Sequence, residues 1–151
     1  MSDEMTTRDG GAQTRLTVTA GPYTFGGVLE ERDAPQTCEA FIPLLPFTSR
    51  IIHSRWSGEA AWIPLGDLDI GVGYENHTTY PAPGHILFHP AGLSEAEILF
   101  PYGASRFHSM VGDLAGNHFL TLTEGLEHLR DLGLLCLWEG AKEIVFDLAS
   151  G

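Results

Sequence analysis

Lysine is nearly absent from this 151-residue sequence, in which Lys142 is the only one. Lysine and arginine together number 8, against 20 aspartate and glutamate residues, and the formal net charge at pH 7 is −12. A surface this negative repels phosphate backbones and anionic lipid headgroups. We therefore expect no nucleic acid and no membrane as partners of this protein.

Long apolar runs and paired cysteines are missing as well. No stretch approaches the ~20 consecutive apolar residues that a membrane-spanning helix needs. The acidic, polar first residues lack the apolar centre of a secretory signal, and we expect residues 1–13 to form a disordered leader before one domain, 14–151. Cys38 and Cys136 form no Cys-x-x-Cys motif. This usage is typical of buried, reduced thiols in a cytoplasmic protein.

Common sequence motifs of metal-binding, hydrolytic and nucleotide-binding sites are also absent. The sequence contains no HExxH, no paired Cys/His cluster, no GxSxG and no phosphate-binding glycine motif. His85 and His89 share one face of a predicted strand, but ~13 Å of strand rise separates them, too far to share an ion. We expect no metal and no cofactor, unless the fold assembles His53, His77 and His85 into one site.

What is present is enough apolar sequence for a core, because 43% of the residues are hydrophobic and only 19% are charged. Glycine and proline turns separate short segments whose apolar residues alternate, as in Glu95–Tyr102, and this pattern predicts strands. The predicted strands are Arg15–Ala20, Tyr23–Glu30, Arg50–Ser57, Ala60–Pro64, His85–His89, Glu95–Tyr102, Phe107–Val111, His118–Thr123 and Glu143–Leu148.

Two segments have helical rather than alternating patterns. The first helix is predicted to begin at Asp33, as a capping residue, with Pro35 in the first turn. The second is predicted from Thr123-Glu124 to Gly140, with an apolar face made of Leu126, Leu129 and Leu137. Together these elements predict a mainly β domain, a closed barrel with a helix at each end, which leaves no unpaired edge strand.

The first candidate site is the polar, aromatic stretch from His53 to Glu59. On a strand, His53, Arg55 and Ser57 would share a face. An arginine in an apolar β region needs a carboxylate, a bound anion or solvent. Two interpretations remain open: Arg55 pairs with Glu59 to hold a turn, while Trp56 and Trp62 fill the core, or this stretch forms a pocket wall in which the guanidinium binds a carboxylate.

The second candidate site is Glu75-Asn76-His77. In an extended chain Glu75 and His77 point to the same side, spaced for a carboxylate–imidazole pair capable of acid/base work. The same pattern is typical of a polar strand edge. A further apolar run, from Leu134 to Trp138, either packs under the barrel or forms a contact between subunits.

Three segments carry a resemblance to a known family: Ser54–Ala60 (SRWSGEA), Glu75–Thr78 (ENHT) and Tyr80–Gly84 (YPAPG). The sequence resembles an uncharacterised bacterial family of the cyclophilin-like superfamily. The resemblance implies a closed eight-stranded β-barrel capped by two helices. It also raises peptidyl-prolyl isomerase activity, because Arg50-Ile51-Ile52 is similar to the string that holds the catalytic arginine of true cyclophilins. The glycine, phenylalanine, methionine and glutamine residues that follow in cyclophilins are absent here.

The leading hypothesis is a binding module for a small molecule or peptide end that bears a carboxylate. Its pocket is predicted to be lined by Arg55, Trp56, Glu59, Glu75, Asn76 and His77. The alternatives are a prolyl isomerase, or an acid/base enzyme that uses Glu75 and His77 with Arg55, and a non-catalytic structural subunit that assembles as a homo-oligomer. The leading hypothesis requires that the two candidate segments border one shared hollow.

Overall fold

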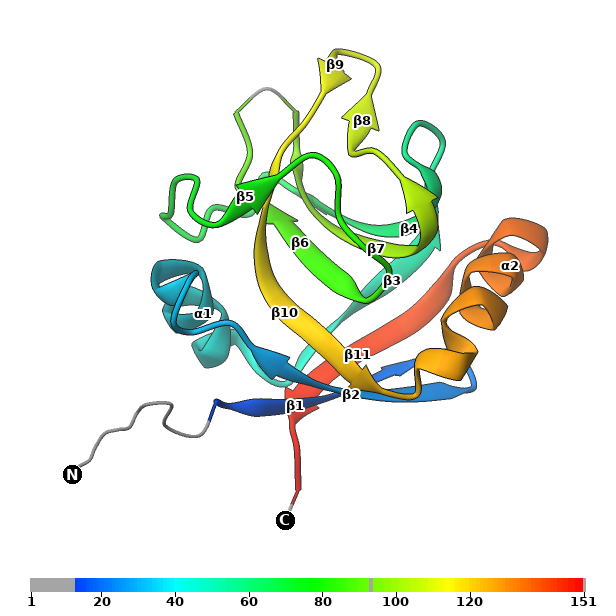
Figure 1. Ribbon diagram of the computed structural model, residues 1–151, viewed down its shortest axis with the longest axis horizontal. Helices are drawn as coiled ribbons and strands as arrows, with labels where there is room; N and C mark the ends of the chain where they lie inside the picture. The colour runs from blue at the N-terminus through cyan, green and yellow to red at the C-terminus, as the bar shows by residue number, and fades with distance from the viewer. Residues whose placement is uncertain (1–12, 93, 151) are drawn as a thin grey trace.

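The computed structural model describes residues 13–92 and 94–150, so all of the predicted leader except Gln13 lies outside the described residues. Eight strands close into an antiparallel barrel in the order β2–β1–β11–β3–β4–β7–β6–β10, and β10 pairs back onto β2 (Figure 1). The barrel strands are β1 (Arg15–Ala20), β2 (Tyr23–Leu29), β3 (Phe47–His53), β4 (Gly58–Gly66), β6 (His85–His89), β7 (Ala96–Ser105), β10 (Gly116–Glu124) and β11 (Lys142–Leu148). The predicted closed barrel is confirmed.

The two helices lie on opposite sides of the barrel in Figure 1. The first, α1 (Pro35–Phe41), continues into the 3₁₀ turn η1 (Ile42–Leu44), and α2 (Leu129–Glu139) follows the turn η2 (Leu126–His128). Asp33 does not cap α1, because the N-cap residue is Ala34 and no side chain bonds to the first turn from that position. None of the helices in the described ranges is long and apolar enough to cross a membrane.

Helix α2 begins later than predicted and buries a different face. Strand β10 continues to Glu124, and Gly125, with φ of 80°, then turns the chain. The buried face of α2 consists of Leu129, Leu132, Gly133 and Cys136. Of the expected face, Leu129 is buried as predicted, but Leu126 and Leu137 are about half exposed, so the prediction was wrong for these two residues. Gly133 is needed here, since a Cβ atom at this position would collide with the ring of Tyr102.

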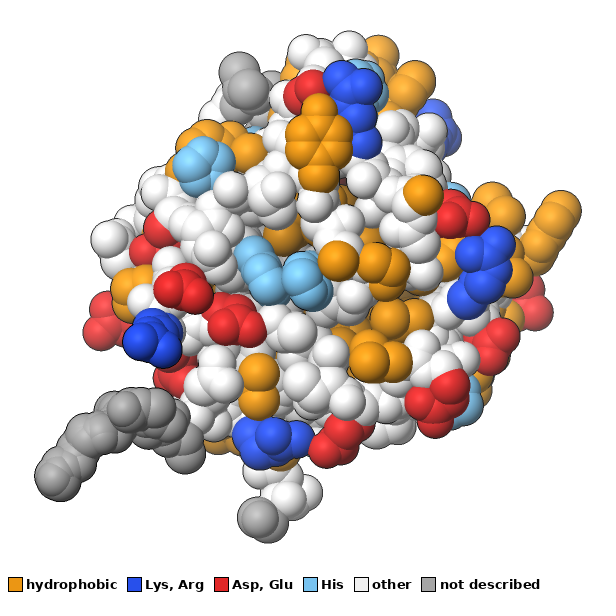
Figure 2. Space-filling model, viewed as in Figure 1, with side chains coloured by type: hydrophobic (Ala, Val, Ile, Leu, Met, Phe, Trp, Pro, Cys, Tyr) orange, Lys and Arg blue, Asp and Glu red, His pale blue; other side chains and the backbone are white. Residues whose placement is uncertain are grey.

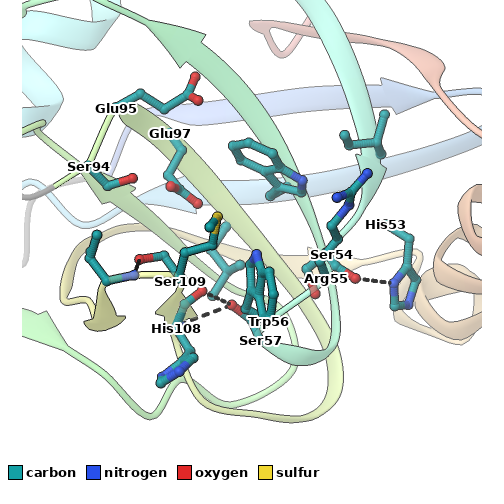
Figure 3. Close-up of a pocket in the computed structure, with 15 residues that line it drawn as sticks. His53, Ser54, Arg55, Trp56, Ser57, Ser94, Glu95, Glu97, His108 and Ser109 are labelled. Atoms are coloured by element: carbon teal, nitrogen blue, oxygen red, sulfur yellow. Dashed lines mark hydrogen bonds between the residues drawn. The ribbon is translucent and has the colours of Figure 1, made fainter.

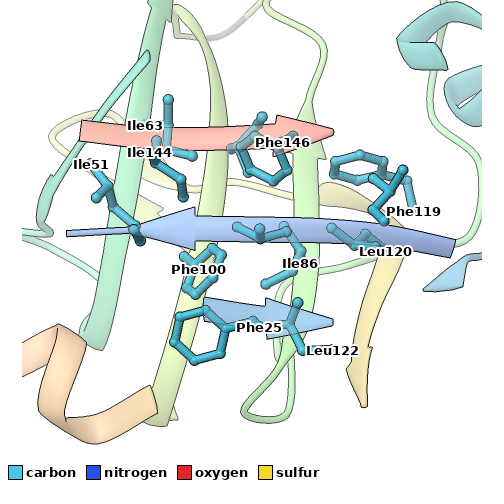
Figure 4. Close-up of a cluster of buried hydrophobic side chains, with 14 of the residues drawn as sticks. Phe25, Ile51, Ile63, Ile86, Phe100, Phe119, Leu120, Leu122, Ile144 and Phe146 are labelled. Atoms are coloured by element: carbon cyan, nitrogen blue, oxygen red, sulfur yellow. The ribbon is translucent and has the colours of Figure 1, made fainter. Parts of the chain in front are cut away.

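The barrel interior is filled by the alternating side chains that the sequence pattern predicted (Figure 4). On β1, Leu16, Val18 and Ala20 are buried, as are Ile98 and Phe100 on β7. Both cysteines are free and buried in the same core.

A second apolar cluster lies on the outer face of the barrel. It consists of Ala60, Leu87, Leu99, Phe107 and Leu114, with Trp62 packed against it. Residues 106–115 cover this face, and they contain β8 (His108–Ser109) and β9 (Gly112–Asp113), which pair as a small separate hairpin. The predicted strand Phe107–Val111 is therefore not a barrel strand. Because this hairpin covers the outside, β7 is buried on both faces.

Candidate functional site

A cavity of about 440 Å³ lies between the outer face of the barrel and the β8–β9 hairpin (Figure 3). Its wall is formed by residues 52–57 at the end of β3 and in the next turn, by Trp62 of β4, by the start of β7, and by residues 108–111 of the hairpin. This volume is in the range of small-molecule sites in proteins. The lining combines two tryptophans with charged groups of both signs.

The turn from Ser54 to Ser57 positions the first candidate residues. The predicted strand Arg50–Ser57 is wrong at its end: β3 stops at His53, and Ser54 N–H donates to the carbonyl of Ala60 across the turn. His53, Arg55 and Ser57 therefore do not share a strand face. The Ser57 hydroxyl donates to the carbonyl of His108 and accepts from its N–H, both at 3.1 Å. These two bonds hold the hairpin over the pocket.

Arg55 and Trp56 both line the pocket, and both are exposed. Among the described residues, no carboxylate lies within salt-bridge distance of Arg55. The proposed Arg55–Glu59 pair is wrong: Glu59 accepts from Ala104 N–H at 2.9 Å and pairs with Arg130 at 3.2 Å. The bond from Ala104, followed by the interaction with Arg130, lowers the pKa of Glu59. Trp56 is 51% exposed and is not a core residue.

Glu97 is a pocket residue that the sequence analysis missed. Its side chain lines the cavity and is only 7% exposed. Burial, and then the neighbouring charge of Glu95, raise the pKa of Glu97 to about 7. No described group donates a hydrogen bond to its carboxyl, whereas Glu95 accepts one from Gly66 N–H at 3.1 Å. Alternation along β7 places Glu97 opposite the core residues, but only the hairpin cover makes that face buried.

The second candidate segment holds the fold together at another place. The carboxylate of Glu75 accepts from the Thr37 N–H at 2.7 Å and from the Thr37 hydroxyl at 2.8 Å. The buried amide of Asn117 donates to the Thr37 hydroxyl at 3.0 Å and accepts from Glu75 N–H at 3.1 Å. Asn76 donates to the carbonyl of His118, and the ring of His77 stacks on Tyr74.

Glu59, Glu75, Asn76 and His77 are not among the residues that line the cavity. The expectation that all six candidate residues share one hollow is therefore not met. The physical reason is topology: β5 (His77–Thr78) pairs with β10, whereas the Arg55 turn joins β3 to β4, and β6 and β7 lie between them around the barrel.

The remaining candidate residues are Arg50 and the histidines considered as metal ligands. Arg50 lies on β3 opposite Glu143 of β11, is exposed, and does not line the cavity. His53 lies 2.8 Å from the Tyr102 hydroxyl, and His85 stacks on His118. Within the described ranges, no three His, Cys, Asp or Glu side chains are grouped to hold a metal ion.

Residues 16–148 match the family described as Protein of unknown function (DUF3830). The chain belongs to this family. No curated protein matches this DUF3830 protein.

Solved structures are similar to it in fold. The structure of McbB in complex with tryptophan has a TM-score of 0.69 and 19% identity over 90% of the chain, which spans 45% of McbB. The hypothetical protein AF2241 from Archaeoglobus fulgidus has a TM-score of 0.54 and 18% identity, over 92% of this chain and 97% of that one.

The cyclophilin-type peptidyl-prolyl cis-trans isomerase cgd2_1660 from Cryptosporidium parvum has a TM-score of 0.57 and 16% identity. That likeness covers 93% of this chain and 99% of the isomerase. Sequence identities this low show a similarity of fold alone. The cyclophilin-like barrel that the resemblance implied is confirmed for this DUF3830 protein.

Proposed function

We propose that this DUF3830 protein binds a small molecule or peptide end bearing a carboxylate, in the pocket beneath the β8–β9 hairpin. The observation that carries the proposal is the guanidinium of Arg55, which lines a cavity of about 440 Å³ and has no carboxylate partner among the described residues. A guanidinium presents paired donors whose geometry matches a carboxylate.

The apolar part of the pocket supports a ligand with an aromatic or aliphatic body. Trp62 packs against the outer apolar cluster, and Leu99 belongs to that cluster. Trp56 and Met110 also line the cavity, and both are largely exposed, so a bound apolar group would remove their surface from water. The solved McbB complex contains tryptophan. This property of McbB makes aromatic carboxylates a reasonable first set of probes here.

Isothermal titration with 3-phenylpropionate, indole-3-acetate and N-acetyl-phenylalanine tests the proposal. We expect binding by at least one of them, weakened about tenfold or more in Arg55→Ala, because a hydrogen bond to a charged group contributes about 1.5–3 kcal/mol. Arg55→Lys should retain part of the affinity, since it keeps the charge but loses the paired donors.

The matched control is Arg50→Ala, which removes an exposed arginine from β3 outside the pocket. This variant should bind like the wild type. Absence of binding by every probe, or equal loss of affinity in the Arg50 and Arg55 variants, would overturn the proposal.

The enzymatic alternative has its own readout. In a protease-coupled assay with a proline-containing peptide, acceleration of isomerisation by the wild type and its loss in Arg55→Ala would replace the binding proposal with a catalytic one.

The homo-oligomer stays a prediction, which light scattering can check. Trp138, 81% exposed on α2, is the first residue to change if self-association is found.

A further inference from the structure

The pocket presents opposite charges on two sides. Arg55 extends from the turn after β3, whereas Glu97 near the start of β7 and Glu95 just before that strand lie on the other side of the view (Figure 3). Trp62 and Leu99 also line the same cavity. A site with both signs of charge discriminates in favour of a ligand with both signs, because a ligand with one charge leaves the other pocket group desolvated and unpaired.

Of the two acidic residues, Glu97 is the one whose carboxyl has no hydrogen-bond donor among the described residues. It is 7% exposed, it faces the cavity, and no described donor satisfies its carboxyl. Across the sheet its neighbours are Pro64 on β4, which has no charge, and His89 on β6, whose Nδ1 lies 2.8 Å from the carbonyl of Ala115. The other ring nitrogen of His89, Nε2, is buried without a partner, and the described residues form no ion pair between His89 and Glu97.

The remaining ionisable groups around the pocket are Glu95, Arg55, His53 and His108, and a ring nitrogen of His53 lies 2.8 Å from the Tyr102 hydroxyl. Glu95 has the same sign as Glu97, and His108 is held by Asp113 at 2.9 Å. Arg55 is exposed, on the turn beyond β3. A positively charged donor for Glu97 therefore has to come from the ligand.

We propose that the ligand is zwitterionic, an amino acid or short peptide with free ends, whose carboxylate binds Arg55 and whose ammonium group binds Glu97. Its apolar body lies against Trp62 and Leu99. This inference rests on the proposed function and adds to it the second charged group of the ligand and the residue that recognises it.

Two pairs of probes test the inference, each differing by a single amino group. The first pair is phenylalanine and 3-phenylpropionate, and the second is glycyl-phenylalanine and N-acetyl-phenylalanine. We expect the amino compound of at least one pair to bind about tenfold more tightly to the wild type at about pH 8. A gain of this size is expected when a charge-assisted hydrogen bond forms in a desolvated site. In Glu97→Gln this ratio should fall to about one, whereas the affinity for the des-amino compound should not fall.

The pH dependence separates an ion pair from simple packing. Because the pKa of Glu97 is raised to about 7, its carboxyl is mostly neutral at about pH 6, and the gain from the amino group should shrink there. The gain in Glu97→Gln should not change with pH. The control is Glu143→Gln, which changes an exposed carboxylate on β11 outside the pocket and should behave like the wild type.

The outcomes distinguish this inference from the proposed function. Equal binding within both pairs, or a gain that survives in Glu97→Gln, overturns the zwitterion and leaves carboxylate binding intact. If no carboxylate binds, phenethylamine decides: its binding, lost in Glu97→Gln, supports the ammonium site although the proposed function has failed. If phenethylamine does not bind either, both proposals are overturned. A melting temperature of Glu97→Gln no lower than that of the wild type at about pH 4 shows that the variant is folded.

Discussion

The pocket under the β8–β9 hairpin and the segment around Glu75 both contain a carboxyl group close to a loop, yet the two carboxyls have opposite surroundings. Glu75 accepts two hydrogen bonds from Thr37. Glu97 has no described donor and faces a cavity. Polar groups that have internal partners hold a fold together, whereas a buried polar group left without one is where a ligand can add binding energy.

The same contrast separates the arginines of the molecule. Arg15, Arg106 and Arg130 each pair with a described carboxylate. Arg55 lies in the pocket wall with no such partner among the described residues. Its substitution should therefore affect binding and leave the fold unchanged.

The largest effect is expected for Glu75→Ala, which should lower the free energy of unfolding by about 3 kcal/mol. The variant leaves the N–H and hydroxyl of Thr37, a fully buried residue, without their acceptor. Urea denaturation measures the change, with Glu39→Ala, an exposed carboxylate on α1, as control. A loss below about 0.5 kcal/mol would show that the Glu75 contacts do not stabilise the fold.

An effect of similar size is expected from Glu97, but it depends on pH. Its pKa is raised from 4.5 to about 7 in the folded protein, so folding favours the protonated form. The stability this provides is complete below pH 4.5 and is lost as the pH rises through about 7.

Glu97→Gln should therefore match the wild type near pH 4.5 and be more stable by about 3 kcal/mol at about pH 8. Denaturation curves of both proteins across this range check the difference. A constant difference at every pH would show that Glu97 does not titrate in the way its burial implies.

The smallest effect on stability is expected for Arg55→Ala, within about 0.5 kcal/mol of the wild type. Arg55 is exposed, and no described carboxylate pairs with it, so its removal breaks no ion pair of the folded chain. Thermal unfolding without ligand is the measurement. A loss above about 1.5 kcal/mol would place Arg55 with Glu75, as a residue that holds the structure.

The strands could be predicted from the sequence because alternation is a local property. Arg15–Ala20 and His85–His89 were predicted with the bounds that the structure has. The start of the first helix was harder to predict. Aspartate is a common N-cap residue, which favoured Asp33, but the N-cap residue in the structure is Ala34. Among the candidate site residues, Arg55 and Trp56 line the pocket, and the other four do not.

Glu97 could not be singled out because its burial depends on residues 106–115, which fold back over the outer face of β7. In the sequence, a glutamate that alternates with core residues is typical of a solvent-facing side chain. Likewise, the sequence pattern does not show that Glu75 meets Thr37, 38 positions earlier in the chain.

The amino-acid sequence by itself determined the acidic character of this protein, its alternating strands and the closed barrel they form, because these follow from composition and from the period of apolar residues along the chain. Only the tertiary structure decided which polar groups find partners. The order of strands around the barrel places Glu75 against Thr37, and the hairpin placed over β7 closes a cavity around Arg55 and Glu97. Pairings of this kind join residues far apart in sequence, so they form only when the chain is folded, and local sequence patterns do not predict them.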